Sequence, residues 1–300
     1  MTPQTTGLLL SIAGVILLSP DVLVIRWVEL EHDQVLFWRG VFLTLGFGAV
    51  VLVRHRLKCL RAIVNAGWSG VISGLLFAGN TYCFTQSLQQ TSAAAAMMII
   101  STAPVFAAVI AWLLLGERVN KRTAATIACT LVGISVVAFD RSGVNSVTGN
   151  LYALGCALFM AINFNWARYK APRDLTPGLC FGGIFITGVA LLGEASQVQP
   201  STLQLGAMAL TAAITMPIGF TLLQIAPRYI SATDVSLFLL LEAIVGAFWV
   251  WLALDETPST MTLIGSGVIV TCLTFYAYGN RPGSRLRELS SSKVTKARVT

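Results

Sequence analysis

Charge is scarce in this chain. Charged residues make up only 11% of its 300 residues, whereas hydrophobic residues make up 55% and the mean hydropathy is +0.76. Soluble domains carry roughly 25% charged residues, so a soluble chain of this length could not cover its surface with so few. The composition therefore excludes a soluble globular protein and indicates a membrane protein with several spans.

Metal-binding and catalytic patterns are also missing. The two histidines, His32 and His55, fall in predicted loops, and the six cysteines are scattered singly without a CxxC pair. The motifs H-E-x-x-H and G-x-S-x-G and the phosphate-binding loop are absent as well. We therefore expect no metal centre, no disulfide framework, no cofactor and no enzymatic activity. The net charge of +7 needs no nucleic-acid partner, because the placement of the basic residues in the membrane accounts for it.

Apolar stretches of about 20 residues, the length that crosses a bilayer as a helix, recur along the chain. The connections between them are short, so no soluble domain is inserted. We expect an all-α integral membrane protein with ten transmembrane helices, followed by a basic cytoplasmic tail at 281–300. The expected spans are 5–27, 34–53, 66–89, 92–115, 123–139, 148–167, 176–194, 203–226, 231–254 and 259–279.

Basic residues give these spans a direction, because Lys and Arg concentrate in the cytoplasmic loops of membrane proteins. With the N-terminus inside, nearly all of the 20 basic residues fall on the cytoplasmic side, and only Arg26, Arg39 and Arg141 fall near the other side. The acidic run "ELEHD" at 29–33 also falls outside. Both termini are therefore predicted to be cytoplasmic.

Two segments of the chain end almost alike. The sequence "AWLLLGERVNKR" at 111–122 aligns with "VWLALDETPST" at 250–260 at an offset of 139, yet only the first continues into basic residues. Near the start of each half the offset is 142, which pairs Arg26 with Arg168. Five spans per copy is an odd number, so the second copy is upside down in the membrane. The predicted domains are two inverted five-helix repeats, 1–140 and 148–280.

Inverted repeats favour a transporter, because two such halves can exchange inward-open and outward-open shapes around a site at the membrane midplane. A channel would more naturally close around an axis normal to the membrane. Outside transport, the alternative is a membrane sensor or scaffold.

The sequence "APVFAAVIAWLLLGERVNKR", echoed by "LEAIVGAFWVWLALDET", resembles the ten-helix branch of the drug/metabolite transporter superfamily, the EamA-type exporters. The opening "GLLLSIAGVILLSPDVLVIRWV" and the "FWRG" of the second span are similar to the bacterial amino-acid exporter group typified by YddG. This resemblance implies a central cavity walled by helices one to four and six to nine, with helices five and ten outside it.

The resemblance also implies what the protein moves and where. It implies export of small metabolites, with amino acids as the leading class, across a bacterial cytoplasmic membrane by a monomer or weak homodimer. A multidrug or nucleotide-sugar carrier of the same fold is the alternative within transport, and both facilitated and proton-coupled transport remain open.

Acidic residues inside spans are the first candidates for the substrate site, because a carboxylate at mid-bilayer costs about 2.5–3.5 kcal/mol on insertion scales. Asp21 follows Pro20 and could bind a substrate ammonium group, or it could form a structural ion pair with Arg26 or Arg39. Glu242 lies near the middle of its span, one helical turn from Phe238, so both could line the cavity. The alternative for Glu242 is a hydrogen bond to a neighbouring helix, and for Phe238 it is packing.

Polar and aromatic residues at related depths complete the candidate set. Asn163 is the counterpart of Asp21 at the offset of 142, and the nearby Trp166 adds apolar surface, although such amides also serve as contacts between helices. The remaining candidates, for which packing is the competing interpretation, are Asn80 and Tyr82 in the third span and Met97 and Ser101 in the fourth.

Overall fold

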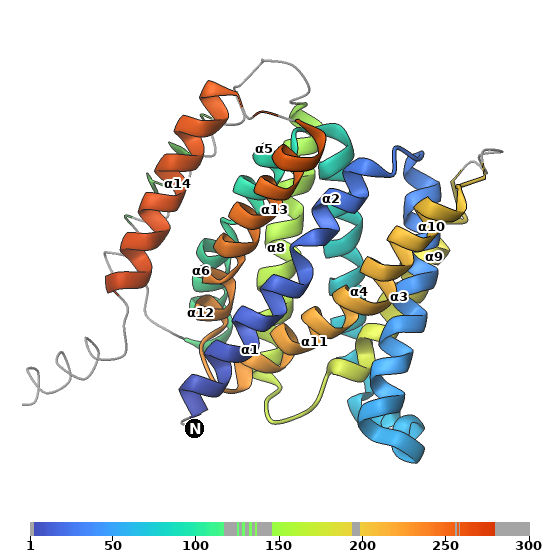
Figure 1. Cartoon of the computed structure of the whole chain (residues 1–300). Coiled ribbons are helices and arrows are strands. Elements are labelled where there is room, and N and C mark those ends of the chain that lie inside the picture. The colour runs from blue at the N-terminus through green and yellow to red at the C-terminus, as the bar shows by residue number, and fades with distance from the viewer. Residues whose placement is uncertain are drawn as a thin grey trace, which may run out of the picture.

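The computed structural model describes residues 3–116, 146–193, 199–255, 257 and 259–279, with a few single positions between 125 and 136. In this part of the chain the regular elements are helices, and Figure 1 shows them packed side by side as a bundle. The first half contains α1 (Pro3–Leu18), α2 (Pro20–Trp27), α3 (His32–His55), η1 (Arg56–Lys58), α4 (Cys59–Gln90), α5 (Ala93–Ile100) and α6 (Ala103–Leu115). The second half contains α8 (Val147–Tyr169), η2 (Thr176–Gly178), α9 (Leu179–Ala190), α10 (Thr202–Ala209), η3 (Leu210–Thr215), α11 (Met216–Ile225), η4 (Ala226–Arg228), α12 (Ala232–Leu237), α13 (Leu239–Leu254) and α14 (Thr260–Gly279).

Several apolar spans are present, as the sequence predicts. Among the described residues, seven helical stretches are long and apolar enough to cross a membrane, and they coincide with seven of the predicted spans. Shorter apolar helices lie at the predicted spans 176–194 and 259–279. Most of the predicted span 123–139 and the whole basic tail lie outside the described residues, so the count of ten stays a prediction.

Four of the spans are interrupted near their middle. At Ser19–Pro20, α1 gives way to α2, because proline has no N–H group for the helical ladder. Between α5 and α6, Ser101 Oγ donates to the carbonyl of Met98 at 2.6 Å and Thr102 Oγ1 donates to that of Ile99 at 2.7 Å. Both hydroxyls thus donate to carbonyls of the last turn of α5, where the helical ladder is interrupted.

The other two interruptions lie in the second half. A π-helical segment, η3, separates α10 from α11, and the junction of α12 and α13 lies at Phe238. Discontinuous helices of this kind line the binding sites of many transporters.

The two halves meet through close helix contacts. A Cβ on Gly40 would overlap Thr187 of α9, and a Cβ on Gly183 would overlap Thr44 of α3, so only glycine allows this approach. Thr44 donates to the Gly40 carbonyl at 2.8 Å and Thr187 donates to the Gly183 carbonyl at 2.9 Å. The contact is the same from either side, as a two-fold axis passing between α3 and α9 would make it.

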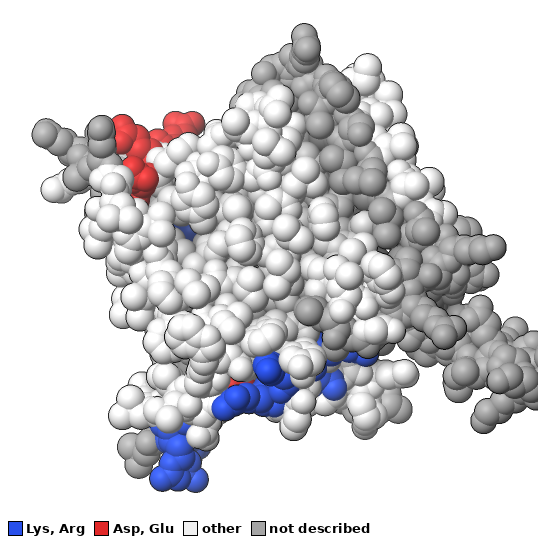
Figure 2. All heavy atoms as spheres, turned by 180° about the vertical axis from the view of Figure 1, so that it is seen from behind, with Lys and Arg blue, Asp and Glu red and all other residues white. Residues whose placement is uncertain are grey.

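Charge separates towards the two ends of the bundle, as Figure 2 shows. The basic end, which also holds the N-terminus in Figure 1, carries the exposed residues Arg54, Arg56, Lys58, Arg61 and Arg173. The acidic end, opposite to it, carries the exposed Glu29 and Glu31 with the half-buried Asp33. The direction in which the spans cross the membrane stays a prediction.

Candidate functional site

A buried ion pair lies where the interrupted helices meet. Asp21, in the first turn of α2, accepts hydrogen bonds from Nη1 of Arg39 at 2.7 Å and from Nη2 at 2.5 Å. Both side chains are 2–3% exposed. The structure therefore places Asp21 in the ion pair that the sequence left as its alternative role. Such a two-pronged pair fixes the orientation of both groups.

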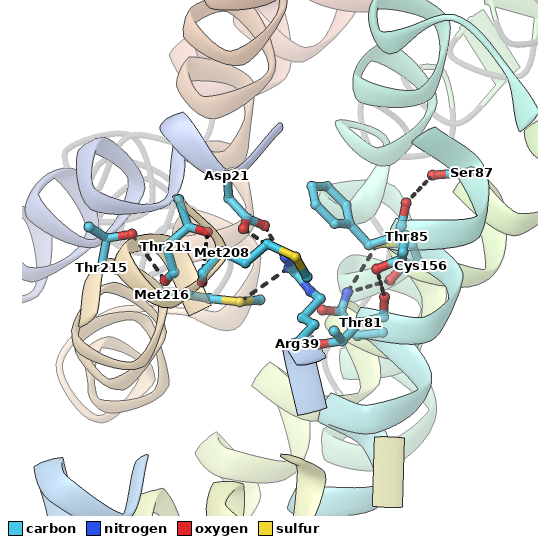
Figure 3. A network of polar contacts seen from close by, with 12 residues as sticks. Asp21, Arg39, Thr81, Thr85, Ser87, Cys156, Met208, Thr211, Thr215 and Met216 are labelled. Carbon is cyan, nitrogen blue, oxygen red and sulfur yellow. Dashed lines mark hydrogen bonds and ion pairs between the residues drawn. The ribbon is translucent and has the colours of Figure 1, made fainter. Parts of the chain in front are cut away.

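The surroundings of Arg39 come from both halves of the chain. Figure 3 shows Met216 on one side of its guanidinium group and the α4 residues Thr81 and Thr85 on the other. Nη2 of Arg39 lies 3.2 Å from the sulfur of Met216, and the ring of Phe84 lies 5.8 Å from its Cζ. Its buried Nε has no hydrogen-bond partner among the described residues. A buried donor without a partner is costly, so it is a candidate contact for a bound ligand.

Asn80 joins this centre to α8. Its amide donates to the carbonyl of Cys156 at 3.2 Å and contacts the sulfur of Cys156 at 3.1 Å. Asn80 is 3% exposed, so its side chain faces the interior of the bundle.

Glu242 completes the polar centre. It lies in the first turn of α13, just after the break at Phe238, and is 7% exposed. Its carboxyl group lies near that of Asp21, and the Cys156 thiol lies near both Glu242 and Arg39. Within the described residues, Arg39 pairs with Asp21, and no basic side chain forms an ion pair with Glu242. Of the two buried carboxyl groups, that of Asp21 thus has a guanidinium partner, and that of Glu242 has none among the described residues.

Asn163 belongs to a separate network nearer the basic end. Its Oδ1 accepts from Ser73 Oγ at 2.7 Å, its Nδ2 donates to Gln224 Oε1 at 3.1 Å, and Gln224 Nε2 donates back to Ser73 Oγ at 2.9 Å. All three side chains are buried. The network satisfies its own polar atoms and leaves no group for a substrate.

A layer of aromatic rings separates the two polar groups. Phe77 lies between Ser73 and Asn80 along α4, 5.1 Å from the ring of Phe47 and 4.5 Å from that of Phe220. Phe164 packs on Phe220 at 6.1 Å, and all four rings are fully buried. This phenylalanine layer lies between the polar centre and the network of Asn163.

The remaining candidates lie in different surroundings. Met97 and Ser101 are fully buried, on or just after α5, and Phe238 packs against the core at the break that precedes Glu242. Tyr82 packs edge-on against Tyr152, and the Trp166 indole donates to the carbonyl of Ser69 at 3.1 Å. Trp166 also lies 4.7 Å from the Lys170 ammonium group, so it belongs to the basic end and not to the polar centre.

A groove of about 800 Å³ opens at the acidic end. Its lining includes Ile25, Leu88 and Arg26, together with the acidic run 29–33. Ile25 lies one helical turn from Asp21 along α2, on the side of the acidic end.

Sequence reasoning missed Arg39 and Cys156 as members of the site. Arg39 was assigned to the outer end of its span, because "FWRG" stands at the edge of an apolar run. The available signal was a basic residue within reach of an acidic one inside the membrane. Cys156 gave no signal, since single cysteines usually act as small apolar residues.

Comparison with known proteins identifies the family. The model of the EamA-like transporter family matches the chain twice, over residues 5–139 and 147–278. One similar solved structure, a crystal structure of a protein, is 17% identical in sequence and has a TM-score of 0.64. That similarity covers 90% of this chain and 96% of that one, and it shows the fold alone. A comparison with curated protein sequences gave no match. The two matches cover most of the chain, and it therefore belongs to the EamA-like transporter family, whose members carry small molecules across membranes.

Proposed function

We propose that this transporter exports small metabolites by alternating access and that amino acids are its substrate class. In this proposal the chain belongs to the amino-acid exporter group, and its substrate binds at the polar centre formed by Asp21, Arg39, Asn80 and Glu242. The observation that carries the proposal is a pair of buried carboxyl groups, of which that of Asp21 is paired with a guanidinium group and that of Glu242 has no basic partner among the described residues.

A ligand that carries both an ammonium and a carboxylate group fits this set of buried charged groups. The ammonium group supplies the basic partner that Glu242 lacks among the described residues. The Nε of Arg39 supplies a hydrogen-bond donor for the carboxylate of the ligand. The neighbouring Phe84 and Met216 offer apolar contact for a side chain. A small number of placed polar groups in apolar surroundings is typical of small-molecule sites.

The proposal includes the orientation in the membrane. The basic end faces the cytoplasm of a bacterial cell, both termini lie on that side, and the two halves are inverted repeats. A cysteine that replaces Lys58 should react with an impermeant thiol reagent only from the cytoplasmic side, and one that replaces Glu31 only from outside. Reaction of both from the same side would contradict this orientation.

Counterflow into liposomes that contain the purified protein tests the substrate class. We expect accumulation of at least one zwitterionic amino acid. We also expect Glu242→Gln to raise its KM by about tenfold or more, because a hydrogen bond to a charged group contributes about 1.5–3 kcal/mol. Glu31→Gln is the matched control, because it removes an exposed carboxylate at the acidic end. If the protein takes up only nucleotide sugars or lipophilic cations, amino acids are not its substrate class. If it takes up no solute at all, a scaffold or sensor is favoured.

A further inference from the structure

Two short linkers occupy related positions at opposite ends of the bundle. The first linker, Thr91–Ser92, joins α4 to α5 at the acidic end. The second linker, Tyr229–Ser231, joins η4 to α12 at the basic end. Ser92 caps α5 by accepting from the N–H of Ala95, and Ser231 caps α12 by accepting from that of Asp234. The two serines are counterparts at the offset of 139.

An arginine from the same half holds each linker. Arg26 Nη1, at the end of α2, donates to the carbonyl of Leu88 at 2.7 Å and lies 3.5 Å from that of Thr91. Arg168 Nη1, near the end of α8, donates to the carbonyl of Ile230 at 3.2 Å. Arg26 and Arg168 are counterparts at the offset of 142, and Thr91 and Ile230 at 139. The repeat has thus kept the same arginine contact at both ends.

A glycine from the opposite half closes onto each linker. A Cβ on Gly149 of α8 would lie 2.9 Å from the backbone carbon of Gln90 and 2.9 Å from Thr91 Cβ. A Cβ on Gly7 of α1 would lie 2.8 Å from Ile230 Cγ2 and 3.0 Å from Tyr229 Cβ. Gly7 and Gly149 are again counterparts at 142. Unlike the arginine contacts, these two contacts cross between the halves.

The contacts between the halves differ in chemistry at the two ends. At the acidic end Thr91 Oγ1 also donates to Oδ1 of Asn150, at 3.1 Å, so a hydrogen bond links the halves there. The counterpart of Asn150 is Leu8, and the crossing at the basic end is an apolar contact between Ile230 and Gly7.

We propose that the contact of Gly149 with the first linker is the gate at the acidic end and that the contact of Gly7 with the second linker is the gate at the basic end. The inference rests on the proposed alternating access. Each arginine keeps its linker in shape, and the gate opens where the halves separate, on the glycine side. Both gates are closed in this structure. A side chain at either glycine wedges its own gate open and shifts the population toward the state open at that end.

Opposite effects of two matched substitutions test the proposal. Cys156 is a suitable reporter, because it is fully buried beside Asn80 at the polar centre. With the other five cysteines replaced by serine, an impermeant thiol reagent is applied from each side of oriented vesicles. We expect Gly149→Val to speed the reaction of Cys156 from the acidic end by at least about fivefold, and Gly7→Val to do so from the basic end. Gly48→Val, at an exposed glycine with no atom near its added Cβ, should change neither rate.

A disulfide supplies a second test that adds no bulk. In the same background, cysteines that replace Thr91 and Asn150 can be oxidised by copper phenanthroline to join the halves at the acidic end. Reaction of Cys156 from that end should then fall by at least about fivefold while reaction from the basic end persists. Acceleration by both valine variants from the same end, or an unchanged rate after cross-linking, would overturn the gate assignment. Neither labelling test needs substrate, so a transporter of another solute would contradict the proposed function alone.

Discussion

Asp21 and Asn163 occupy the same place in the two repeats, yet they lie in different environments. Asp21 forms an ion pair with Arg39 beside a second carboxyl group, whereas Asn163 closes a neutral network with Ser73 and Gln224. The shared scaffold explains why both positions are polar and buried. In the proposed function the first position takes part in ligand binding, whereas the second joins helices on the other side of the phenylalanine layer.

The largest loss of folding stability is expected at Arg39, because it pairs with the charged Asp21, whereas the counterpart Asn163 is neutral. Arg39→Met leaves Asp21 as a buried carboxylate without its partner, which costs about 3–5 kcal/mol of folding stability. Thermal unfolding in detergent measures the loss, and transport should cease. The double variant Asp21→Asn with Arg39→Met should regain most of the stability without regaining transport. If Arg39→Met is as stable as the wild type, the ion pair does not stabilise the fold.

A smaller loss is expected at the neutral counterpart. Asn163→Ala leaves Ser73 and Gln224 short of partners and should cost about 1–3 kcal/mol. The KM for substrate should stay unchanged, because the network satisfies itself. Ser73→Ala, which changes another member of the same network, is the matched control and should likewise lose stability with an unchanged KM. A raised KM in Asn163→Ala without a loss of stability would move Asn163 into the substrate site.

The contact between α3 and α9 at Gly40 and Gly183 should respond equally from both halves. Gly40→Ala and Gly183→Ala each push a methyl group against a threonine of the other helix, and each should cost about 1 kcal/mol or more. Because the environments match, the two losses should agree within about 0.5 kcal/mol. Unfolding temperatures that differ widely between the variants would argue against the symmetry of this contact.

The smallest effect is expected at Asp174, which binds Arg228 at 2.9 Å and Arg54 at 3.4 Å at the basic end. Partial burial raises the pKa of this carboxyl group, but Thr176 and the guanidinium groups of Arg54 and Arg228 outweigh it and hold the pKa below its ordinary value. The stability that Asp174 contributes is therefore present above the pKa of the unfolded chain, about 3.9, and is lost as the pH falls through the lower folded value.

Asp174→Asn tests that linkage. The variant should lose up to about 1 kcal/mol at neutral pH, because partly exposed pairs are screened by water. Its stability should also fall less steeply than that of the wild type in acid, which unfolding curves between neutral and acidic pH measure. Parallel curves would show that Asp174 does not contribute to the pH dependence.

Much of the fold could be predicted because hydropathy and charge act locally. The apolar runs around α1–α2, α3 and α8 are long enough to identify each span without knowledge of its neighbours. The site was harder to predict from the sequence. Asn80 could be named as a candidate from its place in an apolar span, whereas the partner of Asp21 depended on how helices pack. Trp166 was grouped with Asn163 by sequence distance, but its indole turns to Ser69.

The sequence by itself determined the membrane environment, the places of the apolar spans and the duplication, because each depends on composition or on residue order alone. Only the tertiary structure decided that Arg39, Asn80 and Cys156 meet Asp21 and Glu242, and that Asn163 faces Ser73 and Gln224. A helix can present a polar residue at a given depth, but its rotation and its neighbours are fixed by close packing, as at Gly40 and Gly183. Side chains from distant parts of the sequence become partners only through that packing.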